Sequence, residues 1–393
     1  MRNSNMFKRL LLLVAILITV QSCAHRQKLT PPPPEQIKHI FYTEQKPEAF
    51  YRKSITPFQK PSFISIAAVG DIFIGNHVIY YLKKHGTGYP FDSTKAVLTA
   101  ADLAIGNLEA PFATKGKKFD KKFNFKIHPK YATGLPDAGF DVLNLANNHT
   151  MDYGVEALVS TLNTLDSLGL KYSGAGLNKE QALRPAIMEH NGIKVAFIGC
   201  SLTFPAEFWA TEDSAGTFYP QETELVNMIK YCEGVADFTV ITFHWGAESR
   251  ITPKPYQRDY AHLSIDAGAD LIIGHHPHVL QGVELYRNRL IFYSLGNFAF
   301  GSYTKKARDA AILKAYLTTS GLLYARVIPI SVYNYEVSFQ PRILKRKQAN
   351  RVISHLKEIS LHLNKNENII TDEGIIWGDW SIIHEPRKFA ITE

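Results

Sequence analysis

The sequence predicts an α/β fold in which buried strands alternate with amphipathic helices. From residue 63 onward, β-branched or aliphatic runs of strand length recur, and several are separated by segments with helical spacing of apolar residues. The chain has 393 residues, of which 45% are hydrophobic and 12% aromatic. A chain of this composition can bury a sizeable core, which excludes disordered and collagen-like proteins.

The first part of the chain contains six strand-length apolar runs, at residues 63–69, 103–105, 142–146, 195–199, 238–243 and 271–273. We expect helices between them, at residues 155–168, 221–231 and 256–267. In the first helix the apolar residues recur at helical spacing, and Gly169 ends the pattern. Strand and helix in this order favour an α/β architecture with right-handed crossovers.

The pattern changes after residue 280, where apolar runs follow one another without room for helices. We expect strands at residues 283–286, 290–293, 311–318, 322–332 and 335–339. This succession predicts an antiparallel portion, closed by a helix at residues 344–361. We therefore assign a core at residues 63–305, strands and a helix at 306–363 that complete the same domain, and a C-terminal tail at 364–393.

The N-terminus has the order of residues of a bacterial secretory signal. Three basic side chains precede an apolar run at residues 10–20, which is too short to span a bilayer as a helix. The sequence Val-Gln-Ser-Cys that ends at Cys23 resembles a lipoprotein cleavage box. We expect removal of residues 1–22 and a lipid on Cys23, which would anchor the chain to a membrane of the cell envelope, facing the periplasm or the exterior. A simple signal peptide or a signal anchor with an incidental cysteine is the alternative.

Residues 23–62 are polar and include four consecutive prolines. This composition is typical of a polyproline II spacer, so we expect a tether that holds the globular body away from the membrane.

The chain has only three cysteines, too few for a disulfide framework. Cys200 and Cys232 could form one bridge in an oxidising compartment or remain buried free thiols.

The charge of the chain is +8, and removal of residues 1–22 would leave +5. Much of the excess lies in two clusters, one within residues 115–122 and one within 342–351. A solvated face would account for either cluster, but the first could attract a polyanion. We do not expect nucleic-acid binding, because no nucleic-acid module is recognisable and a lipidated chain lies outside the cytoplasm.

Side chains that can bind metals follow five of the predicted strands. Ligands of an α/β sheet bind beyond the carboxyl ends of its strands. Any one of these residues alone would suit a turn, a cap or the core, but five such ends together indicate a site. Mixed carboxylate, amide and imidazole ligands suit Zn, Mn or Fe rather than Ca. The residues are Asp71; Asn107 and Glu109; Asn147, Asn148, His149 and Asp152; His244 and Glu248; and His275, His276 and His278.

Seven motifs in order resemble those of the CapA family of poly-γ-glutamate capsule synthesis proteins. They lie at residues 68–71, 106–111, 144–154, 174–176, 243–246, 274–278 and 294–298. The CapA family is similar to calcineurin-like metallophosphoesterases. The resemblance therefore implies a metallo-dependent phosphatase-like fold, an α/β two-sheet sandwich flanked by helices.

The resemblance also implies roles for single residues. The implied metal ligands are Asp71, Asn107, Glu109, Asn148, His244, His276 and His278. His149, oriented by Asp152, would stabilise or protonate the leaving group. We further expect Glu248, Asn297, Lys117 and Lys118 to contact the substrate.

Two departures from the phosphoesterase pattern concern the metal. Phosphoesterases carry a histidine two places after the first aspartate, where this chain has Phe73, and an aspartate where it has Asn107. The bridge between two ions would then be an amide or a displaced Glu109. One divalent ion, a rearranged pair or an emptied binding site remain open.

Three functions follow. The first is a membrane-tethered, metal-dependent hydrolase-like enzyme that acts on poly-γ-glutamate or a related envelope polymer. The second is a non-catalytic factor that binds an anionic polymer during assembly or export, together with other capsule-synthesis proteins. The third is a general envelope phosphoesterase, which the missing imidazole at Phe73 disfavours. Metal content and the effect of His276→Ala separate the first from the second.

Overall fold

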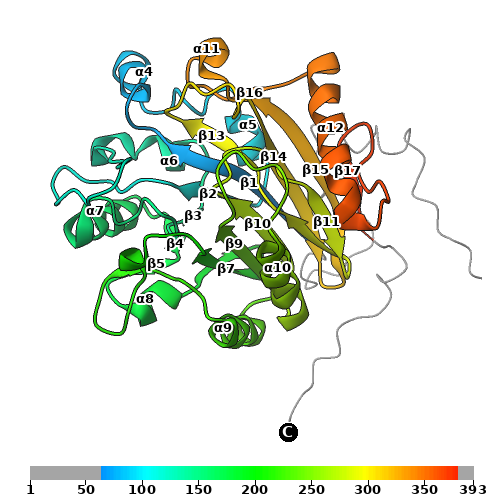
Figure 1. Cartoon of the computed structure of the whole chain (residues 1–393), viewed down its shortest axis with the longest axis horizontal. Coiled ribbons are helices and arrows are strands. Elements are labelled where there is room, and N and C mark those ends of the chain that lie inside the picture. The colour runs from blue at the N-terminus through cyan, green and yellow to red at the C-terminus, as the bar shows by residue number, and fades with distance from the viewer. Residues whose placement is uncertain (1–62, 379–393) are drawn as a thin grey trace, which may run out of the picture. The chain divides into compact units, whose positions relative to one another are not determined.

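The computed structural model describes residues 63–378, whose strands form two large sheets packed face to face, with helices against their outer faces (Figure 1). This arrangement confirms the α/β two-sheet sandwich flanked by helices. The expected signal peptide at residues 1–22, the lipidated Cys23 and the tether at 23–62 lie outside the described residues.

The first sheet has the strand order β16-β15-β14-β1-β2-β3-β4, with β13 paired to β1 and β17 to β15. Strands β1 to β4 and β13 run parallel, and β14 to β17 pair antiparallel. The bounds are β1 Phe63–Phe73, β2 Leu103–Leu108, β3 Val142–Asn144, β4 Lys171–Ser173, β13 Asn297–Phe300, β14 Asp309–Thr318, β15 Gly321–Ser331, β16 Arg342–Ile343 and β17 Ile375–Trp377.

The second sheet has the order β11-β12-β10-β9-β7-β6, and β5 with β8 forms a separate two-stranded ribbon. Strands β7, β9, β10 and β12 are parallel, while β6 and β11 close the two edges as antiparallel neighbours. The bounds are β5 Ala175–Gly176, β6 Ala186–His190, β7 Ile193–Ser201, β8 Gly216–Thr217, β9 Phe238–His244, β10 Leu271–His275, β11 Val283–Tyr286 and β12 Arg289–Phe292.

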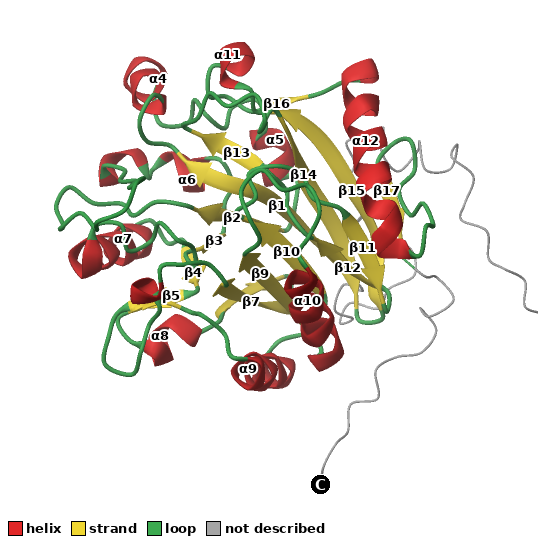
Figure 2. Cartoon of the chain, in the orientation of Figure 1, coloured by secondary structure: helices red, strands yellow, loops and turns green. Residues whose placement is uncertain are grey.

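The helices lie mainly between consecutive strands (Figure 2). The expected helices at 155–168, 221–231, 256–267 and 344–361 are present as α7, α9, α10 and α12. The bounds are α4 Val78–His85, α5 Lys95–Thr99, α6 Gly134–Asp137, α7 Gly154–Ser167, α8 Lys179–Leu183, α9 Glu222–Val235, α10 Pro255–Ala267, α11 Asn334–Val337 and α12 Arg346–Ser360, with 3₁₀ turns at Pro129–Tyr131, Ala206–Phe208 and Leu361–Asn364.

The alternation of side chains along β1 shows how the layers are built. Ile64, Ile66 and Ala68 belong to the core between the two sheets, whereas Ala67 and Val69 pack toward the helices on the outer face. A strand buried on both faces is mostly apolar along its length. Its polar side chains are therefore confined to its ends, where the candidate site lies.

The expected strand at residues 335–339 is wrong. These residues form the one-turn helix α11, after which Ser338 and Phe339 take positive φ. Asn334 closes this turn, because its Nδ2 donates to the carbonyl of Phe300 at 2.7 Å and its Oδ1 accepts from the Phe339 amide at 3.0 Å. The apolar residues alternate as they do in a strand, but the side chain of Asn334 stabilises a turn here instead.

Two further features bear on the expectations. Cys200 and Cys232 are free and buried, so no bridge joins them. The segment assigned to the C-terminal tail contributes β17, which pairs with β15. Within residues 63–378, no helix is both long and apolar enough to cross a membrane.

Candidate metal centre

The candidate site lies where the carboxyl ends of β1 and β2 in the first sheet meet those of β9 and β10 in the second. In register, Asp71 is flanked by Asn107 on β2 and Asn297 on β13, and His244 is opposite His275. Only glycine fits just before Asp71, because a Cβ at Gly70 would lie 1.8 Å from the carbonyl oxygen of Gly296. The expected donors thus come from two sheets that face each other.

Asp71 is fully buried, and both of its carboxylate oxygens have partners. Oδ1 accepts a hydrogen bond from Asn107 Nδ2 at 2.8 Å. Oδ2 accepts one from the His276 amide at 3.3 Å and lies 3.1 Å from His278 Nδ1. Burial alone raises the pKa of Asp71, but the hydrogen bond and charge of His278 outweigh it and lower the pKa. Asp71 is therefore an anion whose two oxygens already accept hydrogen bonds from neighbouring groups.

Glu109 is also fully buried, but neither of its carboxylate oxygens has a hydrogen-bond partner among residues 63–378. Oε1 lies 3.7 Å from His278 Nε2, 3.8 Å from His244 Nε2 and 3.9 Å from His149 Nε2. Burial, and then the charge of Asp71, raise the pKa of Glu109 well above its ordinary value. A buried carboxylate without donors is costly, so this position favours a cation.

The imidazoles around Glu109 are buried or half-buried and differ in their partners. His278 Nδ1 lies 2.8 Å from Asn297 Oδ1, which leaves Nε2 toward Glu109. Burial lowers the pKa of His278, but the charges of Glu109 and Asp71 raise it overall to about 10. His276 Nδ1 and both nitrogens of His275 have no hydrogen-bond partner among residues 63–378, although His275 Nδ1 lies 3.6 Å from Asp71 Oδ1. Burial lowers the pKa of His276 to about 3 and that of His275 to about 4.

His149 forms a second feature of the site, a buried pair with Asp152. Its Nδ1 lies 2.7 Å from Asp152 Oδ2, and its ring stacks on Phe125 with centroids 4.0 Å apart. Asp152 is held in turn by Lys121 Nζ at 2.5 Å and by the Phe125 amide at 2.5 Å. Burial lowers the pKa of His149, although Asp152 partly offsets this. The neutral ring therefore directs an unprotonated Nε2 toward Glu109.

The donor set fits a divalent metal. Two groups have ligand atoms within 4.8 Å of one another: Glu109 with His276 and His278, and Asp71 with Glu109 and His244. Imidazole and carboxylate donors suit Zn, Mn or Fe. The unpartnered oxygens of Glu109 and the unpartnered Nδ1 of His276 are the atoms that an ion would satisfy.

The structure brings most of the predicted site residues together. Asn148 Oδ1 lies 2.8 Å from His244 Nε2, and Asn297 contacts His278. Glu248 lies near enough to raise the pKa of both Glu109 and His278. Lys117 and Lys118 are exposed on the loop between β2 and the 3₁₀ turn at Pro129–Tyr131, and no hydrogen bond or ion pair in the described structure joins them to the donor atoms.

Sequence reasoning missed Asn144, Lys121 and Phe125 as site residues. Asn144 ends β3 and donates to Asn107 Oδ1 at 2.9 Å. Its signal was a polar residue inside an otherwise apolar run. Lys121 was counted only as part of a basic cluster, and Phe125 carries no sequence signal for its contact with His149.

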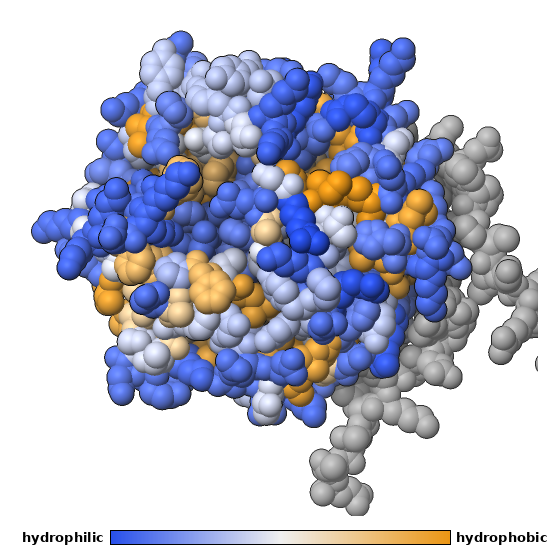
Figure 3. Space-filling view, viewed as in Figure 1, coloured by the Kyte–Doolittle hydropathy of each residue, from blue (hydrophilic) through white to orange (hydrophobic). Residues whose placement is uncertain are grey.

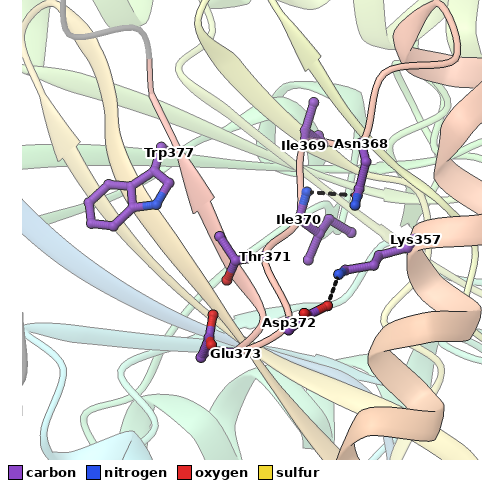
Figure 4. A pocket seen from close by; sticks show the side chains of 8 residues that line it. All are labelled: Lys357, Asn368, Ile369, Ile370, Thr371, Asp372, Glu373 and Trp377. Atoms are coloured by element: carbon purple, nitrogen blue, oxygen red, sulfur yellow. Dashed lines mark hydrogen bonds and ion pairs between the residues drawn. The ribbon is translucent and has the colours of Figure 1, made fainter. Parts of the chain in front are cut away.

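A shallow pocket of about 570 Å³ lies elsewhere in the molecule, between α12 and β17 (Figure 4). An ion pair of Lys357 with Asp372 and the ring of Trp377 lie at its edge. The pocket shares no residue with the candidate site.

The family comparison agrees with the site. Residues 65–302, which carry all of its donors, match the family described as "Bacterial capsule synthesis protein PGA_cap". The chain belongs to this family. The "Capsule biosynthesis protein CapA" of Bacillus anthracis is 35% identical over 277 residues, which cover 68% of this chain and 67% of that protein. The "PGA biosynthesis protein CapA" of Bacillus subtilis (strain 168) is 34% identical over 273 residues, which cover 69% of this chain and 72% of that protein.

Two solved structures are similar to this chain at much lower identity. The calcineurin-like phosphoesterase YfkN from Bacillus subtilis is 14% identical with a TM-score of 0.41, over 77% of this chain and 98% of that one. The 5'-nucleotidase precursor from Thermus thermophilus is 11% identical with a TM-score of 0.43, over 72% of this chain and 54% of that one. The chain thus spans about half the length of this nucleotidase.

Proposed function

We propose that this member of the capsule synthesis family is a metal-dependent hydrolase that acts on poly-γ-glutamate or a related anionic polymer of the cell envelope. The observation that carries the proposal is Glu109, a fully buried carboxylate without hydrogen-bond donors that lies among imidazole nitrogens. Such a group is costly to bury, and groups of this kind cluster at functional sites.

Glu109, His276 and His278 would hold a divalent ion in this centre. When bound, such an ion polarises the scissile group and lowers the pKa of a bound water toward ~7. Asp71 and Asn297 hold His278 from behind through Nδ1, which keeps Nε2 directed at Glu109.

His149 is the residue that moves protons. Because Asp152 accepts from Nδ1, His149 Nε2 is the atom that can take a proton from water or pass one to the leaving group. Asp152 keeps its orientation through Lys121 and the Phe125 amide, and the stacked Phe125 ring shields the pair from water. The pair is therefore preorganised before substrate arrives.

The loop between β2 and the 3₁₀ turn at Pro129–Tyr131 provides positive charge for an anionic substrate. Lys115, Lys117, Lys118 and Lys122 are exposed on it and form no ion pair within residues 63–378. Hydrophilic side chains gather at the left edge of the face shown in Figure 3, where the cyan segment that follows β2 lies in Figure 1. A polymer with one carboxylate per residue would be attracted to this loop and delivered to the adjacent site.

The expected tether completes the proposal. A lipid on Cys23 and the proline-rich residues 23–62 would hold residues 63–378 at the membrane surface, where an envelope polymer is assembled. Palmitate labelling that is lost on Cys23→Ser would support this part, and unchanged labelling would contradict it.

The test of the hydrolase uses the full-length chain purified in detergent, loaded with Mn²⁺ or Zn²⁺. Poly-γ-glutamate, peptidoglycan fragments and a generic phosphodiester are the substrates, and polymer length is followed by gel electrophoresis. We expect shortening of the polyglutamate that is lost in His276→Ala and kept in His362→Ala, a change at an exposed histidine. Polymer binding that survives His276→Ala without any turnover would instead support a non-catalytic assembly or export factor.

A further inference from the structure

We propose that the centre holds a single ion on Glu109, His276 and His278. Asn107 prevents a second ion from binding at Asp71, Glu109 and His244, because it fixes the tautomer of His244. The proposal rests on the metal centre of the proposed function and specifies its stoichiometry. It bears on the two candidate groups of donors, which share Glu109.

The orientation of Asn107 is determined by two neighbouring amides. Its Oδ1 accepts from Asn144 Nδ2 at 2.9 Å and from Asn147 Nδ2 at 3.3 Å. Asn144 cannot turn over, because its Oδ1 accepts from the Ala146 amide at 3.0 Å and its Nδ2 donates to the Ala146 carbonyl at 3.2 Å. The backbone thus dictates which end of Asn144 meets Asn107.

Asn147 is anchored in the same way. Its Nδ2 donates to the Leu108 carbonyl at 2.8 Å, and its Oδ1 accepts from the His149 amide at 3.0 Å. Both amides therefore present donors to Asn107 Oδ1. The NH₂ group of Asn107 must then face the opposite side, toward Asp71 and His244.

This NH₂ group sets the proton of His244. Asn107 Nδ2 lies 3.2 Å from His244 Nδ1, so Nδ1 must accept the hydrogen bond. A neutral imidazole has one acceptor nitrogen and one N–H, so the proton of His244 is on Nε2. That proton has a partner, since Asn148 Oδ1 lies 2.8 Å from Nε2. His244 thus directs an N–H, and not a lone pair, toward the space beside Glu109.

The other imidazoles are turned the opposite way. His278 Nδ1 faces the oxygens of Asn297 and Asp71 and keeps its proton, so Nε2 is the nitrogen that would release a proton and offer its lone pair to an ion. His276 Nδ1 has no partner that would claim its lone pair. A metal ligand needs such a free lone pair, so His276 and His278 qualify and His244 does not.

Asp71 is a weaker donor than Glu109 in the second group for a similar reason. Its Oδ1 is occupied by Asn107, and its Oδ2 by the His276 amide and the His278 ring. Three of the roughly four lone-pair sites of Asp71 are thus engaged, and in the group of Asp71, Glu109 and His244 only Glu109 has oxygens without any hydrogen-bond donor. Two histidines and one glutamate, by contrast, are a complete set of protein ligands for a catalytic ion that keeps an open position for water.

The test measures bound metal. Full-length protein in detergent is saturated with MnCl₂, freed of unbound ion by gel filtration, and analysed by inductively coupled plasma mass spectrometry and electron paramagnetic resonance. We expect one Mn²⁺ per chain and the spectrum of an isolated ion. Two ions per chain, or the spectrum of a coupled pair, would overturn the proposal but leave a metal-dependent hydrolase standing. No bound ion would overturn both.

Two variants probe the role of Asn107 directly. Asn107→Asp replaces the NH₂ donor with an acceptor, which allows His244 to move its proton to Nδ1 and offer Nε2, so we expect two ions per chain. Asn178→Asp, at the N-cap of α8 where either side chain can cap, is the matched control and keeps one ion. An Asn107→Asp protein that folds, by circular dichroism, and still holds one ion would refute the proposed role of Asn107.

His244→Ala decides the question if Asn107→Asp does not fold. His244 is not a ligand in this proposal, so we expect the variant to retain one Mn²⁺. Its metal affinity should be within roughly tenfold of the parent, because removal of a residue that only supports the ligands has a small effect. His276→Ala should hold none. Loss of the ion from a folded His244→Ala protein would show that His244 is a ligand.

Discussion

Replacing Glu109 with glutamine should have opposite effects on the metal-free and the metal-loaded protein. Without metal, Glu109 is a buried carboxylate whose oxygens lack donors, and glutamine keeps its shape without its charge. An unsatisfied buried group of this kind costs about 2 kcal/mol. For roughly 300 folded residues, the unfolding entropy is about 0.6 kcal/mol/K. We therefore expect Glu109→Gln to raise the Tm of the metal-free protein by about 3 °C.

The pH dependence of this difference has a definite sign. The pKa of Glu109 is raised in the folded state above its ordinary value of 4.5 because of burial and the charge of Asp71. The folded parent protein therefore becomes less stable as the pH rises from 4.5 through the folded-state pKa of Glu109. The two proteins should therefore have similar Tm values at about pH 4, and glutamine should be the more stable at pH 7.5.

Metal should reverse the order. A ligand at one hundred times its Kd stabilises the folded protein by about 2.7 kcal/mol, or about 4 °C here, and only the parent should show this shift. Differential scanning fluorimetry with EDTA or MnCl₂ measures both effects, and Glu358→Gln, an exposed position on α12, is the control. The reasoning fails if metal-free Glu109→Gln is less stable than the parent, or if its Tm still rises with metal.

Three further predictions concern other parts of the molecule. His149→Ala should lower kcat by roughly 10²–10⁴ while metal content stays unchanged, and loss of the ion instead would assign His149 as a ligand. Lys117→Gln with Lys118→Gln should raise KM for poly-γ-glutamate roughly three- to tenfold at low salt and little at 0.5 M NaCl, and an effect insensitive to salt would exclude electrostatic attraction. Cys200 and Cys232 should resist iodoacetamide at pH 8 in the folded protein, because burial raises the pKa of both thiols, that of Cys232 to about 12; mass spectrometry would reveal any labelling before unfolding.

The positions of the donors could be predicted from the sequence because strands buried on both faces leave only their ends for polar residues. Asp71, Glu109 and His244 each follow such a run, and the structure brings them together. The division of these strands between two sheets could not be predicted from the runs alone. β9 and β10 are as apolar as β1, and the partner of a strand depends on contacts with segments far along the chain, such as β14 beside β1.

The orientation of each polar group was also beyond sequence reasoning. The direction of the Asn107 amide depends on Asn144 and Asn147, whose own orientations depend on the backbone of the loop after β3. The approach of Phe125 to His149 depends on the path of a loop without periodic pattern. Such contacts depend on the folded arrangement of the site and produce no recognisable residue spacing in the sequence.

The distance along the chain between the donors constrains when the centre can form. The Asp71 carboxylate meets the His276 amide across 205 residues, and β1 completes its sheet only with β13 and β14, which come later still. A sheet closed by such distant segments forms late in folding. The donor atoms are therefore scattered until nearly all of residues 63–378 are available, so the proposed ion would be acquired only where the chain completes its fold. Because such sites discriminate weakly among first-row metals, the metal supply of that compartment decides which ion is bound.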